Sequence, residues 1–450
     1  MLGKRTELVD HIFWITIIFF TNPGGILQAF GENSGDGGIN ATDFLFVVLT
    51  GCYVLTYHKF DYVNDVVYDR LKVYLFIFLA FYLVVFGFIV PIFNDRPGYS
   101  PVFSFIKNRK AIINIFLFIY IYKFYLRSYL LFYKFFIYSS ILILILFIIT
   151  IVTGIEILPI DEYRRNFTTL KRMFMPSYGL LPVLIPMGVV VLIFKFDFKY
   201  KKQIFLGFLL MFTAYVFSIT RRFIFGTFIV FFLGMILNSF ILNKSMFSIK
   251  KVLKAVLFSV VIFYGIYFTL PKYFDAGILA FEETIHVFRY GESSSGKKDE
   301  RLGFSRKFIV DIIKEYPFFG TGFDNRWRTA EGDKEGYEAA DYPLLSAFAM
   351  TGIFGILVFL PIYIVLVRAL IYDIKFLRKH KYNLHSFESF LLITFILFFV
   401  YDLLVYINWF YAIAKASGNT TWYFMLVLYV ASRGIFYNSY TINQMKPTNE

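Results

Sequence analysis

Cysteine and histidine are scarce in this chain of 450 residues. Cys52 is the only cysteine, and the five histidines show no pair at a metal-ligand spacing such as H-x-x-x-H. A single thiol excludes an intramolecular disulfide and a zinc site built from several cysteines. We therefore expect no bound metal and no cofactor. Acidic residues are also few, since 31 Asp and Glu accompany 45 Lys and Arg.

Long apolar runs dominate what the sequence does contain. Hydrophobic residues make up 58% of the chain and aromatic residues 22%, whereas a soluble domain averages roughly 45–50% apolar. The apolar residues form blocks of about 17–25, the length that crosses a bilayer as a helix. Strands of a membrane barrel would instead alternate over about ten residues. The pattern predicts an all-α, polytopic helical membrane protein.

The hydropathy pattern predicts about twelve transmembrane helices. Their ranges are near 11–30, 43–57, 73–93, 111–126, 128–153, 177–196, 203–220, 223–242, 253–270, 342–367, 387–409 and 421–437. The chain then divides into spans one to nine in 1–270, an extracytoplasmic loop domain in 271–341, and spans ten to twelve with a cytoplasmic C-terminus in 342–450.

The basic residues set the orientation and explain the net charge of +14. Lys4 and Arg5 precede the first span, and alternate loops are rich in lysine, as expected of cytoplasmic loops. Both termini are predicted to be cytoplasmic, and the segment 154–176 falls outside with the long loop. Nucleic-acid binding is the competing interpretation of the charge, but the sequence has no RNA- or DNA-binding motif. We expect the bilayer, and no nucleic acid, as a partner.

The long outer loop contains one amphipathic segment, "FSRKFIVDIIKEYP". Its apolar residues recur at helical spacing, and Pro317 follows its end. The spacing predicts a helix that lies along the membrane surface or covers a cavity.

Three groups of basic residues lie on the predicted outer face. Arginine stays charged and presents a planar fork that suits phosphate, although a single loop arginine more often pairs weakly with a nearby acid. Arg221 and Arg222 differ because they interrupt an apolar stretch, where a charge is costly and usually functional. The three groups are Arg164, Arg165, Lys171 and Arg172; Arg221 and Arg222; and Arg301, Arg306, Arg326 and Arg328.

Two carboxylates are candidates for chemistry or binding. Asp341 precedes the tenth span with Pro343 two residues on, a good start signal for a helix, so Asp341 is either a capping residue or a general base, or both. Gly352 and Gly355 follow on one helix face, which allows close packing of a neighbouring helix. Asp402 lies within a span and is expected to pair with an arginine or to face a wet cavity.

Two consecutive segments carry a family resemblance. "RLGFSRKFIVDIIKEYPFFGTGF" and "DYPLLSAFAMTGIFGILVFL" resemble the signature region of the bacterial O-antigen ligase and polymerase superfamily, strongest over 301–360 and weaker at "SITRRF" and "RMFMPSYGLLP". In the ligase branch a histidine stands eleven residues before the first glycine of the span. That position is Asp341 here, so the resemblance implies a catalytic base at Asp341 and favours a polymerase over a ligase.

The resemblance also implies a function for the outer arginines. Arg172, Arg221 and Arg301 match those that hold the lipid diphosphate, with Arg306 as the alternative to Arg301, and Arg222, Arg326, Arg328 and Asp402 as further binding candidates. The implied activity is an inverting, metal-independent glycosyltransferase of the inner membrane that polymerises undecaprenyl-diphosphate-linked oligosaccharides at the outer face. Such O-antigen, capsule or exopolysaccharide polymerases can have a chain-length regulator protein as a partner. The alternatives are an O-antigen ligase with a lipid or protein acceptor, and a flippase or exporter, although the sequence lacks the internal repeat common in transporters.

Overall fold

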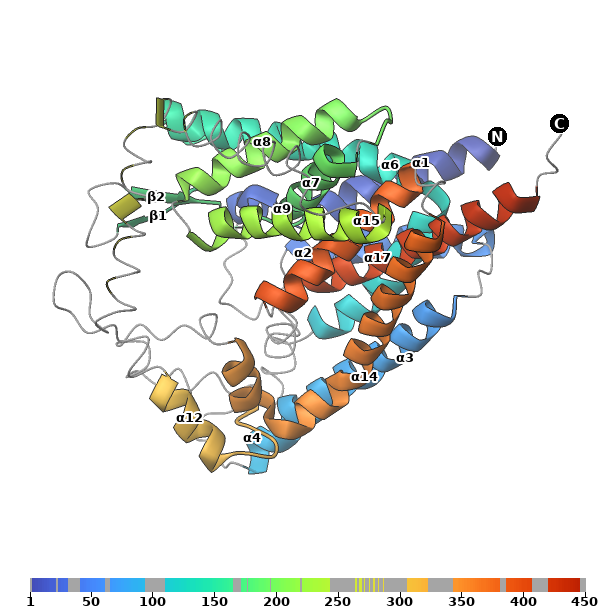
Figure 1. Ribbon diagram of the computed structural model, residues 1–450. Coiled ribbons are helices and arrows are strands. Elements are labelled where there is room, and N and C mark those ends of the chain that lie inside the picture. The colour runs from blue at the N-terminus through green and yellow to red at the C-terminus, as the bar shows by residue number, and fades with distance from the viewer. Residues whose placement is uncertain are drawn as a thin grey trace.

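The computed structural model is dominated by helices (Figure 1). It describes residues 2–21, 23–30, 41–60, 65–93, 110–164, 171–175, 177–194, 196–218, 221–242, 306–322, 343–380, 386–406 and 420–445, with single positions between 264 and 286.

In the first third of the chain, segments of 3-10 and π-helical geometry interrupt the long α-helices. The helix α1 is followed by a short 3-10 segment, η1, in which two adjacent glycines have positive φ. The helix α3 begins with an N-cap at Asp65 and continues through a π-helical segment, η3, into α4. The elements are α1 (Leu2–Phe20), η1 (Pro23–Phe30), α2 (Ala41–Thr56), η2 (Tyr57–Lys59), α3 (Val66–Phe81), η3 (Tyr82–Ile89), α4 (Val90–Phe93) and α6 (Lys110–Thr153).

The helix α6 has 44 residues and bends sharply at Ser128, where φ is −142° and ψ is 35°. The bend brings together side chains eight positions apart. The hydroxyls of Tyr125 and Tyr133 are 2.8 Å apart and their ring centroids 6.0 Å, although eight residues of a straight helix rise about 12 Å. The two arms coincide in position with the predicted spans 111–126 and 128–153, but the structure joins them as one bent helix.

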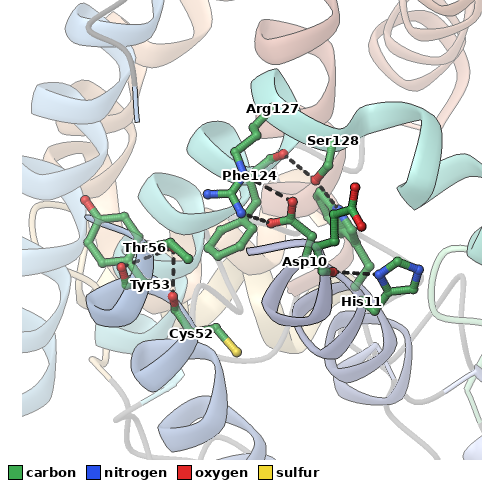
Figure 2. A network of polar contacts seen from close by, with 10 residues as sticks. Asp10, His11, Cys52, Tyr53, Thr56, Phe124, Arg127 and Ser128 are labelled. Carbon is green, nitrogen blue, oxygen red and sulfur yellow. Dashed lines mark hydrogen bonds and ion pairs between the residues drawn. The ribbon is translucent and has the colours of Figure 1, made fainter. Parts of the chain in front are cut away.

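Side chains of α1 hold this bend (Figure 2). The guanidinium of Arg127 donates to both carboxylate oxygens of Asp10, at 2.6 and 3.1 Å. The indole N–H of Trp14 donates to the hydroxyl of Ser128 at 2.8 Å, and that hydroxyl donates to the carbonyl of Phe124 at 3.0 Å. A bidentate, charge-assisted contact fixes orientation as well as distance, so α1 determines where α6 turns.

A short hairpin and three helices follow. The hairpin was not predicted from the sequence; its strands β1 and β2 are antiparallel and pair Tyr163 with Arg172. The helix α7 is apolar on every side, and its residues from Leu184 to Val191 are buried, as expected of a helix at the centre of a bundle. The elements are β1 (Asp161–Arg164), β2 (Lys171–Phe174), η4 (Leu181–Val183), α7 (Leu184–Phe194), α8 (Lys201–Phe217) and α9 (Arg221–Leu242).

The C-terminal third supplies the predicted surface helix and three long helices. The amphipathic segment forms α12, which ends at Glu315, so the predicted helix before Pro317 is confirmed. The elements are α12 (Arg306–Glu315), α14 (Pro343–Lys379), α15 (Phe387–Tyr401), the π-helical η9 (Asp402–Tyr406) and α17 (Thr420–Met445).

The two termini lie at one end of the bundle, whereas the hairpin and α12 lie away from them (Figure 1). We call the end with the termini the proximal end. Asp10 lies in the N-terminal half of α1 and Arg433 in the C-terminal half of α17. The distal end comprises the hairpin, the start of α9, the end of α15 and the start of α17.

The predicted spans agree with the structure in their positions but not in their number. Each predicted range outside 253–270 contains a helix, and 253–270 falls almost entirely outside the described residues. Only six helices in the described part are long and apolar enough to cross a bilayer, so the count of about twelve is not reproduced. The range 177–196 yields only α7 and η4, because Pro182 and Pro186 shorten the helix. The range 11–30 breaks after Phe20, where "TNPGG" interrupts the helix.

Candidate functional site

Four elements meet around the start of α9 at the distal end. Phe223, two residues after Arg221, stacks on Tyr215 of α8 with 4.6 Å between ring centroids. The ring of Tyr178 packs edge-on against both, at 5.5 and 5.8 Å. One turn further along α9, Gly226 has no room for a side chain, because a Cβ there would overlap the hydroxyl of Tyr401 from α15. The first turn of α9 is therefore fixed on two sides.

Arg221 and Arg222 are the first two residues of this anchored helix, whose first turn has no acidic residue. The start of a helix carries a partial positive charge, so two arginines there are unfavourable unless an anion accompanies them. Backbone amides at the same helix start are suited to bind phosphate groups. The position of the pair thus agrees with a role in anion binding, and their side chains lie outside the described residues.

Asp402 follows Tyr401 at the end of α15, the helix whose Tyr401 contacts α9. Its carboxylate accepts a hydrogen bond from the indole N–H of Trp422 at 3.3 Å, and both residues are buried. Trp422 belongs to the first turn of α17, so this contact joins the end of one helix to the start of the next. The structure thus shows an indole partner that the sequence did not predict. The predicted arginine partner stays a prediction.

A break in α14 forms the second part of the site. Gly352 has a φ of 59° and a ψ of −167°, which interrupts the helix. In an intact helix the amides of residues 353 and 354 would donate to the carbonyls of residues 349 and 350. The turn that follows α12 (residues 317–322) satisfies all four groups instead. The amides of Thr321 and Gly322 donate to the carbonyls of Ala349 and Met350, both at 2.9 Å, and the amides of Ile353 and Phe354 donate to the carbonyls of Pro317 and Phe318, both at 3.1 Å.

We call this four-bond arrangement the interlock, and glycine makes it possible. A Cβ on Gly320 would overlap the carbonyl group of Met350, and one on Gly352 would overlap that of Phe318. Both glycines also have a positive φ, which side chains disfavour. The prediction that Gly352 and Gly355 share one continuous helix face is therefore wrong, because the helix is broken at Gly352 and another backbone takes its place. Another segment does pack closely against Gly352, but it is a turn and not the neighbouring helix that was predicted.

An apolar cavity of about 360 Å³ adjoins the interlock. The turn lines it on one side with Tyr316 to Gly320, and η3 and α4 line the other with residues that include Val85 and Phe93. Phe93 is 83% exposed. The cavity thus lies between the interlock and the C-terminal end of the segment formed by α3, η3 and α4.

The predicted site residues map onto these elements unevenly. Arg172 is in β2, Arg221 and Arg222 begin α9, and Arg306 begins α12, but their side chains are outside the described residues. Wholly outside are Arg301, Arg326, Arg328 and Asp341, the last of which lies two residues before α14. Whether these groups meet around one substrate stays a prediction. Of the predicted site side chains, the structure describes that of Asp402.

Sequence reasoning missed the residues that pack around the start of α9 and those that form the interlock. It did single out the residues that are proposed to bind or react with substrate. Tyr401 and Trp422 gave no signal beyond apolar character, because aromatic residues are common throughout the chain. Gly320 and Gly322 stood in the first of the two segments that carry the family resemblance, and their partner, the backbone around Gly352, lies some thirty residues later. Within the described part of the chain, no group of three His, Cys, Asp or Glu side chains could hold a metal ion.

Comparison with known families places this region. Residues 177–360 match a family model described as O-Antigen ligase. The chain contains a domain of the O-antigen ligase and polymerase superfamily. With its apolar helices, the chain is a multi-pass membrane protein that carries this domain. The O-antigen ligase domain runs from the segment before α7 through the break in α14, so it includes the start of α9 and the interlock, whereas Arg172 and Asp402 lie outside it. A comparison with curated proteins found no match.

Proposed function

We propose that this protein is an inner-membrane glycosyltransferase that polymerises lipid-diphosphate-linked oligosaccharide repeat units at the outer face of the membrane. The observation that carries the proposal is the extent of the O-antigen ligase domain. It contains Arg221, Arg222 and Asp341, and the structure anchors the first turn of α9, where the two arginines lie, at the distal end.

The proposed reaction is a displacement at an anomeric carbon. The Asp341 carboxylate takes the proton of an acceptor sugar hydroxyl, whose oxygen then forms the new bond to the anomeric carbon of the donor. The bond from that carbon to the lipid diphosphate breaks, and the diphosphate leaves with the bonding electron pair. Arg221 and Arg301, with Arg172 and Arg306, stabilise the growing negative charge on the leaving group.

The acceptor distinguishes a polymerase from a ligase. A polymerase transfers the growing glycan to the sugar end of another lipid-linked repeat unit, whereas a ligase transfers it to a different lipid or protein. Asp341 at the place of the ligase-type histidine favours the polymerase. The description of the matching family favours the ligase as the second candidate.

The purified protein with lipid-linked repeat units as the sole substrate tests this choice. A ladder of products separated by one repeat unit supports the polymerase. Transfer of a single glycan only after an acceptor lipid is added would identify a ligase. Substrate movement across a proteoliposome membrane without any new glycosidic bond would identify a flippase and refute the proposed chemistry.

The proposed topology has twelve crossings, cytoplasmic termini and an extracytoplasmic segment 271–341. It is supported by the placement of both termini at the proximal end and of the hairpin and α12 away from them (Figure 1). Ser294→Cys in a Cys52→Ala background tests the orientation with a membrane-impermeant thiol reagent. Labelling of intact spheroplasts supports it, and labelling only after lysis would reverse the sidedness and displace the site to the cytoplasm.

A further inference from the structure

The interlock joins two elements that carry proposed site residues. Its turn extends directly from α12, which begins with Arg306, and its other half is the nine-residue start of α14 before Gly352, which we call the α14 stub. The stub begins two residues after Asp341. Any movement of α12 relative to the stub would therefore alter the relation between a proposed phosphate ligand and the proposed base.

The helix α12 and its turn form one continuous unit. The amide of Tyr316 donates to the carbonyl of Ile312 at 2.9 Å, and the amide of Gly320 donates to that of Tyr316 at 3.1 Å, so hydrogen bonding continues from the helix into the turn. Ile309 is 0% exposed and Ile312 is 9% exposed. The opposite face of α12 carries the exposed pair Lys314 and Asp311. One covered face and one solvated face fix the rotation of α12 about its axis.

We propose that the interlock is a positioning element of the active site, with Gly320 and Gly352 as its essential residues. Four hydrogen bonds between backbones define the relation of α12 to the α14 stub, and they do so at positions where a side chain cannot fit. The role rests on the proposed transferase function and adds to it two residues that do not touch substrate. Fixed geometry of this kind matters because a misplacement of about 1 Å far from the reacting atoms can reduce the rate about 10²-fold.

Gly154 provides a matched control for backbone strain. Its φ of 71° resembles that of Gly320, at 63°, but a Cβ on Gly154 would meet nothing within 4 Å. Gly154→Ala and Gly320→Ala therefore introduce similar strain, and only the second pushes against the α14 stub. We expect kcat of Gly320→Ala to fall about 10²-fold with KM nearly unchanged, and kcat of Gly154→Ala to stay within about twofold of the wild type. Equal kcat values for the two variants would refute the positioning role.

A reversible crosslink separates positioning from folding. The amide of Thr321 lies 2.9 Å from the carbonyl of Ala349, so Thr321→Cys and Ala349→Cys in a Cys52→Ala background should form a disulfide across the interlock. Oxidation of this pair should leave kcat intact in the otherwise native protein and restore it in the Gly320→Ala variant. Loss of turnover on oxidation would show that the interlock must open, which contradicts the proposal.

The outcomes also separate this inference from the proposed function. A wild-type protein without transferase activity would overturn both. An active wild type together with an active Gly320→Ala variant would overturn the positioning role alone. If Gly320→Ala fails to accumulate in the membrane, the cysteine pair decides by itself, since retained kcat after oxidation supports a fixed interlock and lost kcat refutes it.

Discussion

The helices are held together by different kinds of contact at the two ends of the bundle. At the proximal end, charged side chains connect helices: Arg433 of α17 contacts Asp373 of α14 at 2.9 Å and Asp65 before α3 at 3.7 Å. Away from the termini, the interlock joins α14 to the turn after α12 through backbone groups, and Gly226 lies against Tyr401, beside the ring contacts of Phe223 and the hydrogen bond from Trp422 to Asp402. The proximal network is therefore sensitive to the loss of a charge, and the interlock to the addition of a methyl group.

The difference fits a molecule in which one end uses charged side chains for stability and the other can use them for binding. A buried carboxylate or guanidinium that is already paired is occupied, as Asp373 is by Arg433 and by the hydroxyls of Tyr429 and Tyr437 at 2.7 and 2.8 Å. Where backbone groups make the contacts between helices, side chains are not needed to hold the helices together. A site that must bind a diphosphate benefits from that arrangement, because its arginines need not be taken from structural pairs.

The largest expected effect is on the proximal network. Arg433→Met leaves the carboxylate of Asp373, which is 0% exposed, without its cationic partner, and this should lower the free energy of unfolding by roughly 3–5 kcal/mol. The double variant Arg433→Met with Asp373→Leu removes both charges and should recover most of that loss. Thermal unfolding in detergent measures both. A double variant as unstable as the single one would show that the charges themselves hold this end together.

At the distal end, Arg221→Ala should remove transfer activity while the protein still accumulates. The loss of one charge-stabilising donor reduces kcat by roughly 10²- to 10³-fold, and Arg221→Lys should recover little because an ammonium lacks the bidentate fork. Lys201→Ala, at the exposed start of α8, is the control and should leave kcat unchanged. Normal polymer from the lysine variant would reduce the requirement at this position to charge alone.

Asp341 tests whether the distal end carries a base. Asparagine caps a helix as well as aspartate does, but it cannot accept the proton, so Asp341→Asn should lower turnover roughly 10²-fold or more with unchanged thermal stability. Asp341→His should retain part of the activity, because a neutral imidazole can act as a base. Polymerisation of lipid-linked repeat units is the assay. Full activity in the Asn variant would leave Asp341 as a cap and make Asp402 the next carboxylate to test.

The smallest effect concerns a single proximal hydrogen bond. The hydroxyl of Tyr129 donates to Glu388 in the first turn of α15 at 2.5 Å. Tyr129→Phe removes that donor and should lower the free energy of unfolding by about 1.5 kcal/mol. Tyr138→Phe on the same helix, where the side chain is 49% exposed, should change it by less than about 0.5 kcal/mol. Equal effects would show that the hydrogen bond to Glu388 contributes no more than an exposed hydroxyl does.

Hydropathy located most helices but missed the break within α14. A window of about twenty residues averages over Gly352, so the run that contains it reads as uninterrupted, whereas the predicted ranges 111–126 and 128–153 did separate next to Ser128. The break at Gly352 depends on a turn that lies some thirty residues earlier, and the bend at Ser128 depends on Trp14 and Arg127. Contacts between distant segments leave no local pattern in one sequence. Local signals served well where they sufficed, as with α12 before Pro317.

The candidate site likewise has features that a local sequence signal indicates and features that depend on distant contacts. Arginines in or beside apolar runs stand out from composition alone, since charges there are rare. The hairpin that carries Arg172, and the contact of Asp402 with Trp422, did not stand out because short polar strands and aromatic residues are both unremarkable in this sequence. Which groups act therefore stays a prediction from the sequence, whereas the contacts that hold the described elements in place came only from the structure.

The bend in α6 has a consequence for how the protein inserts. Residues 110–153 contain neither proline nor glycine, the usual causes of a sharp kink, and the hydroxyl of Ser128 makes a local contribution through its hydrogen bond to the carbonyl of Phe124. As an isolated straight helix its 44 residues would extend about 66 Å, about twice the hydrocarbon thickness, which is a severe hydrophobic mismatch. The earlier helix α1 supplies the carboxylate and the indole that hold the turn, so the fit of residues 110–153 to a bilayer depends on a contact with an earlier helix.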